Sequence, residues 1–482
     1  MSEIQRIVEH LDRILPQFIQ DEPLPGLAVG VVYDHRMIYA KGFGVSDIQS
    51  GEAVTEHTLF HMASVSKTLV ATGMMQLAEE GVIDLDGVVS DYLPYFEMAD
   101  DRSRNLTIRQ LLSHTSGLPD EDDFAWDRPE YDEGSLERYV RSMKDCKLQR
   151  EPGQAFAYSN IGYEILGDVI AKVTGLSFEL YMKQKLLEPA SMLNSTFLKE
   201  EAAETDYPLA VPHVLGLQGG YGAEPSSIFP YHRAHAPSST LYANAVDMCH
   251  YALAHLSGSS TPRGDGKLLL EANSYSEMWR RAASTDYGDI LEDMGLGWFM
   301  GLYRGRRVLS HMGRDTGFRS GFMLLPDEGM GVVFMMNADY VGGKILGSAI
   351  LDVLLGEDVP YVQQSLAHHL SQLTITSGVD AAFREYEEIQ QSCPERFLVI
   401  EGEFNAGAYT LMAGGWLQEG IRLLELSVQI FPESSNLHDS LGEMYLLAGE
   451  RALALMHYEK SVELDPEHAE GIRMVNELLQ SN

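Results

Sequence analysis

The stretch that decides the fold is residues 60–81, FHMASVSKTLVATGMMQLAEEG. Its apolar residues recur at spacings of three and four, which predicts an amphipathic helix that ends at Gly81. Ser64-Val65-Ser66-Lys67 stands at the start of this helix, and residues three apart on a helix share one face. We therefore expect the Lys67 amine to lie beside the Ser64 hydroxyl, near backbone N–H groups that favour negative charge.

This pairing matters because an unassisted serine hydroxyl is a poor nucleophile. A neighbouring amine can accept or relay the hydroxyl proton and so activate the oxygen. The alternative is a helix-capping serine followed by a surface lysine. Against that alternative, no other serine in the chain is followed three residues later by lysine. The sequence therefore favours Ser64 as a nucleophile and Lys67 as its partner.

Composition narrows the class of protein. The length of 482 residues predicts two or more domains, and the formal charge of −36 argues against nucleic acid and anionic membranes as partners. The three cysteines are far apart and form no C-x-x-C pair, so we expect neither a disulfide framework nor a metal site, and no cofactor. The N-terminus lacks the apolar core of a secretion signal and no stretch is long enough to span a membrane, which predicts a cytoplasmic protein.

The order of elements predicts an α+β fold with one antiparallel sheet built from both ends of the first domain. A helix over 4–18 comes first. Strands are expected over 26–33 and 37–44, joined by a short turn at 34–36, and then over 296–303, 307–311, 317–325 and 331–337. An all-helical subdomain with long loops is inserted between the two strand groups. A helix over 345–355 ends the domain, for which we expect the bounds 1–358.

Residues beyond 358 have a different character. We expect a linker over 359–378 and a helical repeat domain over 379–482, which holds 19 acidic and 6 basic residues. Pro432 and Pro466 are 34 residues apart, and Leu441, Gly442, Tyr445, Ala454 and Tyr458 fall at tetratricopeptide-like spacing. The unit from about Glu401 matches less well, and a half-unit over 378–394 precedes it. Such a tail is expected to bind a protein partner or to self-associate.

A second candidate motif is Tyr158-Ser159-Asn160. A tyrosine near a lysine ammonium can have a lowered pKa, which would make its phenolate available as a general base. Asn160 can donate to a substrate carbonyl and accept from the lysine. The pattern alone is weak, because Tyr242-Ala243-Asn244 repeats it.

The third motif is His311-Met312-Gly313, which ends a predicted strand and leads into TGFRSG at residues 316–321. Taken singly, such a histidine is more often structural. The pairs His232/His235 and His368/His369 lack acidic neighbours at ligand spacing, so we interpret them as surface or loop residues. The patterns G-x-S-x-G, the P-loop and the dinucleotide fingerprint are absent.

Together these motifs resemble the serine β-lactamase and DD-peptidase superfamily, in particular the branch of class C β-lactamases, family VIII esterases and D-aminopeptidases. The resemblance covers roughly residues 26–355. It rests on PGLAVGVVYDHRMIYAKGFGVSD, HMASVSKTLVATGMMQLAEEGVIDLD, TIRQLLSHTSGLP, EPGQAFAYSNIGYEILGDVIAKVTG and HMGRDTGFRSGFMLLPDEGMGVVFMMN, in the family's order. The Tyr158 copy follows Pro-Gly and precedes a helix, as that family's pattern requires.

The resemblance implies a role for each site residue. Ser64 would be acylated, with Lys67 and Tyr158 handling protons. Asn160, His311, Gly313 and Arg314 would bind substrate, and the backbone N–H groups of Ser64 and Arg314 would form the oxyanion hole. Two departures stand out: His311 replaces the lysine usual in β-lactamases, and residues 236–240, APSST, lack the expected glycines.

The sequence therefore predicts a serine hydrolase that cleaves small esters or peptide-like amides. A β-lactamase or an acyltransferase on the same site is the alternative. A partner-binding scaffold, acting through the helical tail with a remnant catalytic domain, is the alternative of a different class. The substrate pocket is expected between the loops at 120–134 and 203–235, the second of which we interpret as a lid or substrate-facing insertion.

Overall fold

The computed structural model describes residues 2–121, 123–216, 222–258 and 269–480. The chain divides into two compact units, Met1–Val214 with Ala223–Pro360, and Leu215–Gly222 with Tyr361–Asn482. All the predicted site residues lie in the first unit. Parts of the predicted loops, residue 122 and residues 217–221, fall outside the described residues.

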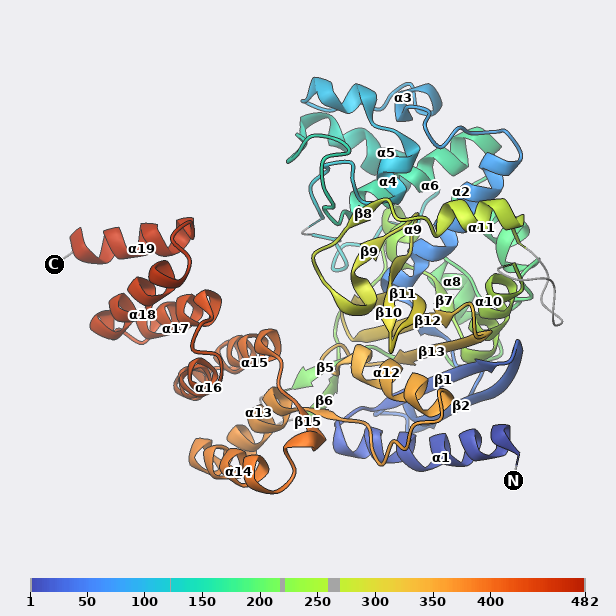
Figure 1. The fold of residues 1–482 in the computed structure, drawn as a ribbon. Helices are drawn as coiled ribbons and strands as arrows, with labels where there is room; N and C mark the ends of the chain where they lie inside the picture. Colours follow the sequence, from blue (N-terminus) through green and yellow to red (C-terminus); the bar gives the residue numbers. More distant parts are fainter. Residues whose placement is uncertain (1, 122, 217–221, 259–268, 481–482) are drawn as a thin grey trace. The chain divides into compact units, whose positions relative to one another are not determined.

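An antiparallel sheet organises the first unit, and its strands come from both ends of that unit as predicted (Figure 1). The order of its described strands is β3-β2-β1-β13-β12-β11-β10-β9-β8. Their bounds are β1 Gly26–Tyr33, β2 Arg36–Asp47, β3 Glu52–Ala53, β8 Ala283–Ser284, β9 Asp293–Met294, β10 Phe299–Tyr303, β11 Arg306–Asp315, β12 Phe318–Leu325 and β13 Met330–Met336. The sequence did not predict β3, β8 and β9, because two residues are too few to show an alternating pattern.

The register joins the first strands directly to the last. Leu27 of β1 pairs with Met336 of β13 on one side and with Phe43 of β2 on the other. The predicted turn between β1 and β2 is made by Asp34 and His35, whose φ angles of 48° and 57° match the backbone that a tight hairpin needs. The central strands therefore hold β11, which carries the third motif, in a fixed register.

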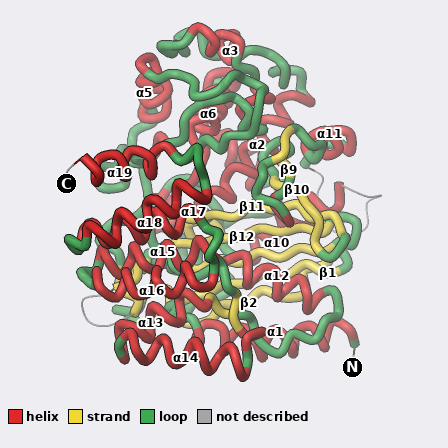
Figure 2. The backbone as a smooth tube through the Cα atoms, turned by 60° about the vertical axis from the view of Figure 1, so that its left-hand side comes forward, coloured by secondary structure: helices red, strands yellow, loops and turns green. Residues whose placement is uncertain are grey.

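Helices pack on both faces of the sheet. On one face, α1 (Glu3–Asp21) and α12 (Gly343–Leu354) lie side by side (Figure 2). α10 (Ala245–Gly258) packs on β1 and β13. A Cβ at Gly30 of β1 would approach the Cys249 sulfur of α10 to 2.5 Å, so this helix lies very close to the strand. All three cysteines of the chain are free.

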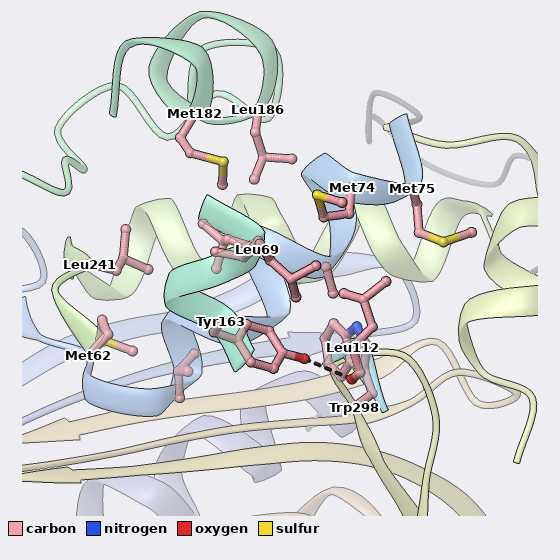
Figure 3. Close-up of a cluster of buried hydrophobic side chains, with 14 of the residues drawn as sticks. Met62, Leu69, Met74, Met75, Leu112, Tyr163, Met182, Leu186, Leu241 and Trp298 are labelled. Carbon is pink, nitrogen blue, oxygen red and sulfur yellow. Dashed lines mark hydrogen bonds between the residues drawn. The ribbon is translucent and has the colours of Figure 1, made fainter. Parts of the chain in front are cut away.

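The helical subdomain surrounds α2 (Ser66–Glu79). Its other helices are α3 Val89–Tyr92, α4 Ile108–Leu112, α5 Ser135–Ser142, α6 Asn160–Thr174, α7 Phe178–Met182, α8 Lys199–Ala203, α9 Ala236–Ser239 and α11 Ala272–Met278. Figure 3 shows apolar side chains packed around α2 from several elements: Met62, Leu69, Met74, Met75, Leu112, Tyr163, Met182, Leu186, Leu241 and Trp298. The Tyr163 hydroxyl donates to the Leu112 carbonyl at 2.9 Å and ties α6 to α4.

The structure corrects one prediction about α2. The helix ends before Gly81 as expected, but it is not amphipathic, because all its residues from Ser66 to Met75 are buried. A helix that is enclosed on all sides is a central core element, so its small and polar residues also face other protein groups. Lys67 is therefore buried instead of lying on a half-exposed face.

The second unit is helical among its described residues outside short strands. Its helices are α13 Leu366–Ser377, α14 Val379–Ser392, α15 Glu401–Ala413, α16 Leu417–Ile430, α17 Ser435–Leu447, α18 Arg451–Leu464 and α19 Ala469–Gln480. α13 lies within the segment expected to be a linker, and it carries His368 and His369. Leu366 and Leu370 of α13 are buried in the apolar core of this unit, which explains why the segment is helical. Within the described residues, no helix is both long and apolar enough to cross a membrane.

Candidate active site

Ser64 lies in η1 (Ala63–Val65), a single helical turn that precedes α2. The residue before it, Ala63, has a φ of 47°, a conformation that is uncommon for residues other than glycine. Contacts from the sheet hold the turn in place. The Ser320 hydroxyl of β12 donates to the Met62 carbonyl at 2.5 Å, and a Cβ at Gly313 of β11 would meet that same carbonyl at 2.4 Å. Gly313 therefore allows β11 to pack directly on the turn that carries Ser64.

The Lys67 amine joins three parts of the chain. Its Nζ lies 2.9 Å from the Ser64 hydroxyl oxygen, one helical turn away, as the spacing predicted. It also donates to Asn160 Oδ1 at 2.6 Å and to the Ser238 backbone carbonyl at 2.8 Å. Asn160 and Ser238 are 93 and 171 residues away in the sequence. Two fixed acceptors leave the third bonding direction of the nitrogen aimed at Ser64.

Burial changes the acid–base properties of Lys67. Removal from water lowers the pKa of its ammonium to about 8, although the Glu164, Asp315 and Asp120 carboxylates act in the opposite direction and raise it. A lysine with this pKa is about one tenth neutral at pH 7. It can therefore act as a proton acceptor near neutral pH, which an exposed lysine cannot.

Tyr158 lies beside Lys67 and Ser64. Its ring stacks on His114 with centroids 4.2 Å apart, and Lys67 Nζ lies 5.2 Å from the ring centroid. The predicted lowering of the Tyr158 pKa is wrong. Burial raises this pKa above its ordinary value, and the hydrogen bond with Ser64 opposes the rise without reversing it. Because burial dominates, Tyr158 stays protonated at neutral pH.

Two residues that the sequence did not single out hold Tyr158-Ser159-Asn160 in place. Asp120 Oδ1 accepts from both the Asn160 backbone N–H, at 2.8 Å, and its side-chain amide, at 2.9 Å. These bonds orient the Asn160 carbonyl oxygen toward Lys67. His114, which is fully buried with a φ of 53°, accepts from the Ser159 N–H at 3.1 Å. Asp120 and His114 are local neighbours in HTSGLPD, but nothing in their spacing indicates these long-range bonds.

The third motif lies inside β11 and not at the end of a strand. His311 is buried, and its Nδ1 donates to the Met312 carbonyl at 2.9 Å. Burial, together with the nearby Lys67 charge, lowers the His311 pKa to about 3. Its imidazole is therefore neutral at physiological pH, and its ring centroid lies 6.4 Å from that of Tyr158. Arg314 is exposed on the same strand, and its side chain does not join this cluster.

The structure also corrects the interpretation of His235 and of the stretch APSST. His235 is buried, and its Nδ1 donates to Glu164 Oε1 at 3.0 Å. His232 is buried as well. The Ser238 hydroxyl donates to the same Glu164 oxygen at 2.6 Å, within the short helix α9. The stretch without glycines is thus a helix that presents the Ser238 carbonyl to Lys67.

A cavity of about 430 Å³ opens between the two loops that the sequence proposed as pocket walls. Trp126 and Tyr131 line it from one loop, and Phe229 and Tyr231 from the other. Lys199 of α8 also lines it, with its Nζ 4.2 Å from the Phe229 ring centroid. Four aromatic side chains share the lining with charged and polar residues, so the cavity offers ring surfaces for an apolar or aromatic ligand group.

The chain is similar to known proteins in both sequence and fold. The Beta-lactamase family model matches residues 11–355. Penicillin-binding protein 4 of Amycolatopsis lactamdurans is 30% identical over 341 residues, which are 69% of this chain and 86% of that protein.

Among solved structures, the octameric penicillin-binding protein homologue from Pyrococcus abyssi aligns with a TM-score of 0.64 and 24% identity, over 73% of this chain and 78% of that one. The D-amino acid amidase from Ochrobactrum anthropi SV3 aligns with a TM-score of 0.59 and 20% identity, over 73% and 97% of the two chains. At these identities the likeness concerns the fold.

The fold and the family match define a serine hydrolase of the β-lactamase/transpeptidase-like superfamily. The chain belongs to the Beta-lactamase family. Proteins with this fold include penicillin-binding proteins, carboxypeptidases and D-amino acid amidases.

Proposed function

We propose that this protein forms an acyl-enzyme on Ser64 and cleaves small esters or peptide-like amides. One observation carries the proposal: the fully buried Lys67 amine, with its pKa lowered to about 8, lies 2.9 Å from the Ser64 oxygen. A buried amine held against a serine hydroxyl is the arrangement that activates serine without a histidine. The branch of esterases and D-aminopeptidases remains the one that the sequence favours.

Acylation begins with the neutral form of Lys67. Asn160 and the Ser238 carbonyl accept its two N–H groups, so its lone pair points at the Ser64 hydroxyl. As the serine oxygen attacks the substrate carbonyl carbon, its proton moves to Lys67 Nζ and the carbonyl π pair moves to oxygen. The backbone N–H groups of Ser64 and Arg314 are proposed to bind that oxyanion.

Collapse of the tetrahedral intermediate expels an alcohol or amine. The leaving group takes a proton, which the protonated Lys67 or the Tyr158 hydroxyl donates. Tyr158 is suited to donate because burial keeps it protonated, and it is hydrogen-bonded to Ser64. Water, or an acceptor amine in an acyltransferase, then attacks the acyl-enzyme with the same groups acting in reverse.

His311 bears on the choice among substrates. Its pKa of about 3 leaves no positive charge at the position where β-lactamases usually carry lysine. A neutral imidazole cannot form an ion pair with the carboxylate of a β-lactam. We therefore propose esters or amides as substrates ahead of β-lactams, with a β-lactamase as the alternative.

The aromatic cavity supplies the substrate's side-chain preference in this proposal. The loop that bears Trp126 is joined to the catalytic residues through Asp120, which is bonded to Asn160. A phenylacetyl ester should therefore have a lower KM than an acetyl ester. Trp126→Ala should remove that difference while leaving the acetyl ester unaffected, as measured by steady-state hydrolysis of the two p-nitrophenyl esters.

Intact-mass spectrometry after exposure to a fluorophosphonate and to activated esters tests the function. We expect a single adduct on the wild-type protein and none on Ser64→Ala. Ser66→Ala is the matched control for a neighbouring serine, because the Ser66 hydroxyl is buried and donates to the Ala63 carbonyl at 2.6 Å. The absence of a wild-type adduct, or its persistence in Ser64→Ala, would exclude the mechanism.

The scaffold remains the second candidate because the helical unit has an apolar core of its own. Tyr409 of α15 donates to Glu443 of α17, and these residues are 34 apart, the period of the tetratricopeptide-like pattern. We propose that this tail binds a protein partner or a second copy of the chain. A partner captured equally by the wild type and by Ser64→Ala, without any adduct on the wild type, would favour this alternative.

A further inference from the structure

Glu164 is a buried carboxyl group that the proposed reaction does not use. It stands on α6 one helical turn after Asn160, so both side chains lie on the face of that helix that looks toward Lys67. Its side chain is fully buried. Carboxyl groups are rarely buried unless their hydrogen-bonding or charge partners compensate for the loss of water.

The partners of Glu164 lead back to the catalytic lysine. Its Oε1 accepts from the Ser238 hydroxyl at 2.6 Å and from His235 Nδ1 at 3.0 Å. The carbonyl of that same Ser238 accepts from Lys67 Nζ at 2.8 Å. We propose that Glu164 is a positioning residue, which holds the Ser238 carbonyl against Lys67 and places a carboxylate near the lysine that favours its charged form.

Glu164 positions one of the two acceptors that hold the Lys67 amine. Lys67 needs two fixed acceptors if its lone pair is to face Ser64, and α6 supports both of them. Asn160 is itself one acceptor, and Glu164 fixes the other through the Ser238 hydroxyl. Without that bond, the Ser238 hydroxyl keeps its 3.4 Å contact with the His235 carbonyl but loses the restraint that ties Ser238 to α6.

Three carboxylates and several neutral groups surround Lys67. Glu164 raises the Lys67 pKa more than Asp315 and Asp120 do. Asp315 of β11 is paired with His61 of the short strand β4 (Phe60–His61) at 2.7 Å, and Asp120 accepts from Asn160. Burial also raises the pKa of Glu164 itself, and the hydrogen bonds from His235 and Ser238 together with the Lys67 charge oppose that rise. Burial keeps four further neighbours neutral, because it lowers the pKa of His114 and His311 and raises that of Tyr158 and Tyr163.

Removing the Glu164 charge should therefore make Lys67 lose its proton at lower pH. In Glu164→Gln we expect the midpoint of the Lys67 titration to fall by about one pH unit, the scale of effect that a nearby buried charge has. A glutamine at this position can still accept from Ser238, so the geometry is kept. In Ser238→Ala we expect the midpoint to change little. The labelling rate at high pH should instead be several-fold lower, because the hydroxyl that positions the Ser238 carbonyl is lost.

The inference rests on the proposed function, so the experiment has two readouts. The first is the rate of fluorophosphonate labelling of Ser64 as a function of pH. The second is the direct titration of Lys67 by NMR of isotope-labelled lysine, assigned with Lys67→Met, which needs no catalytic activity. If the wild type is not labelled, the proposed function fails and the NMR titration still decides the charge role of Glu164.

Asp168→Asn is the matched control. Asp168 is a second buried carboxyl on α6, one turn further on, and it accepts from the Tyr95 hydroxyl at 2.6 Å instead of facing Lys67. We expect this variant to keep the wild-type midpoint in both readouts. An unchanged Lys67 midpoint in Glu164→Gln, or an equal shift in Asp168→Asn, would overturn the electrostatic part. Full high-pH labelling in Ser238→Ala would overturn the positioning part, and it remains decisive if Glu164→Gln fails to fold.

Discussion

Tyr158-Ser159-Asn160 and Tyr242-Ala243-Asn244 share one residue pattern, and the fold gives them different surroundings. Tyr158 stacks on His114 beside Lys67, with its hydroxyl bonded to Ser64. Tyr242 lies in β7 (Tyr242–Ala243), where it pairs with His61 of β4, and its fully buried hydroxyl has no hydrogen-bond partner among the described residues.

The two asparagines differ in the same way. Asn160 begins α6 and donates to Asp120 while its oxygen accepts from Lys67. Asn244 precedes α10, and its Oδ1 accepts from the Asp247 N–H at 2.8 Å, which is an ordinary helix cap. The comparison teaches that the pattern specifies a helix start in both places. The Tyr158 copy differs because the Lys67 amine lies beside it, and this makes it a candidate catalytic motif.

The largest expected difference between the two copies is in their hydroxyls. Tyr158→Phe should lower kcat/KM by about 10²- to 10⁴-fold, because it removes a proton-transferring group. Tyr242→Phe should leave kcat/KM unchanged, because that hydroxyl is unpaired. Steady-state hydrolysis of an activated ester measures both. Equal losses in the two variants would mean that the Tyr158 copy is structural as well.

Substitution of the two asparagines should affect different quantities, activity for Asn160 and stability for Asn244. Asn160→Ala removes a hydrogen bond to a charged group worth about 1.5–3 kcal/mol, so kcat/KM should fall by about 10- to 100-fold. Asn244→Ala should keep the activity but lower the free energy of unfolding by about 1 kcal/mol, the usual cost of a lost cap. Denaturant unfolding and ester hydrolysis, measured on both variants, provide the test. A stable, fully active Asn160→Ala would break the comparison.

The pH profile sharpens the assignment of the base. Because neutral Lys67 accepts the proton, acylation should rise with pH and level off above about 8, falling about tenfold per unit below that value. Tyr158→Phe should lower the plateau without moving the midpoint, since the raised Tyr158 pKa keeps phenolate out of this range. A midpoint that moves in Tyr158→Phe would assign the titration to the tyrosine.

The smallest effect concerns the residue that anchors the Tyr158 copy. Asp120→Ala removes both bonds that orient Asn160, but Asp120 is exposed, so a loss of about fivefold in kcat/KM is expected. Asp123→Ala, in the same loop, also exposed and outside the cavity lining, is the control and should match the wild type. A single-turnover experiment with excess enzyme would place the loss in acylation.

Much of the site could be predicted because its parts are local. The Ser64–Lys67 contact follows from one helical turn, and the hairpin at Asp34 and His35 from turn chemistry. The joining of the first and last strands followed from the position of the strand-like runs on either side of a helical block. The predictions that depended on burial were wrong. They described α2 as amphipathic, His235 as a surface or loop residue, and the Tyr158 pKa as lowered.

By itself, the sequence determined which residues carry chemistry and which elements they start or end, because hydrophobic period, caps and turns depend on near neighbours. The tertiary structure alone decided the acid–base state of those residues. Lys67 has a pKa of about 8 because the fold encloses it and brings acceptors from 93 and 171 residues away. Burial and charge neighbours act through space, so no spacing along the chain records them.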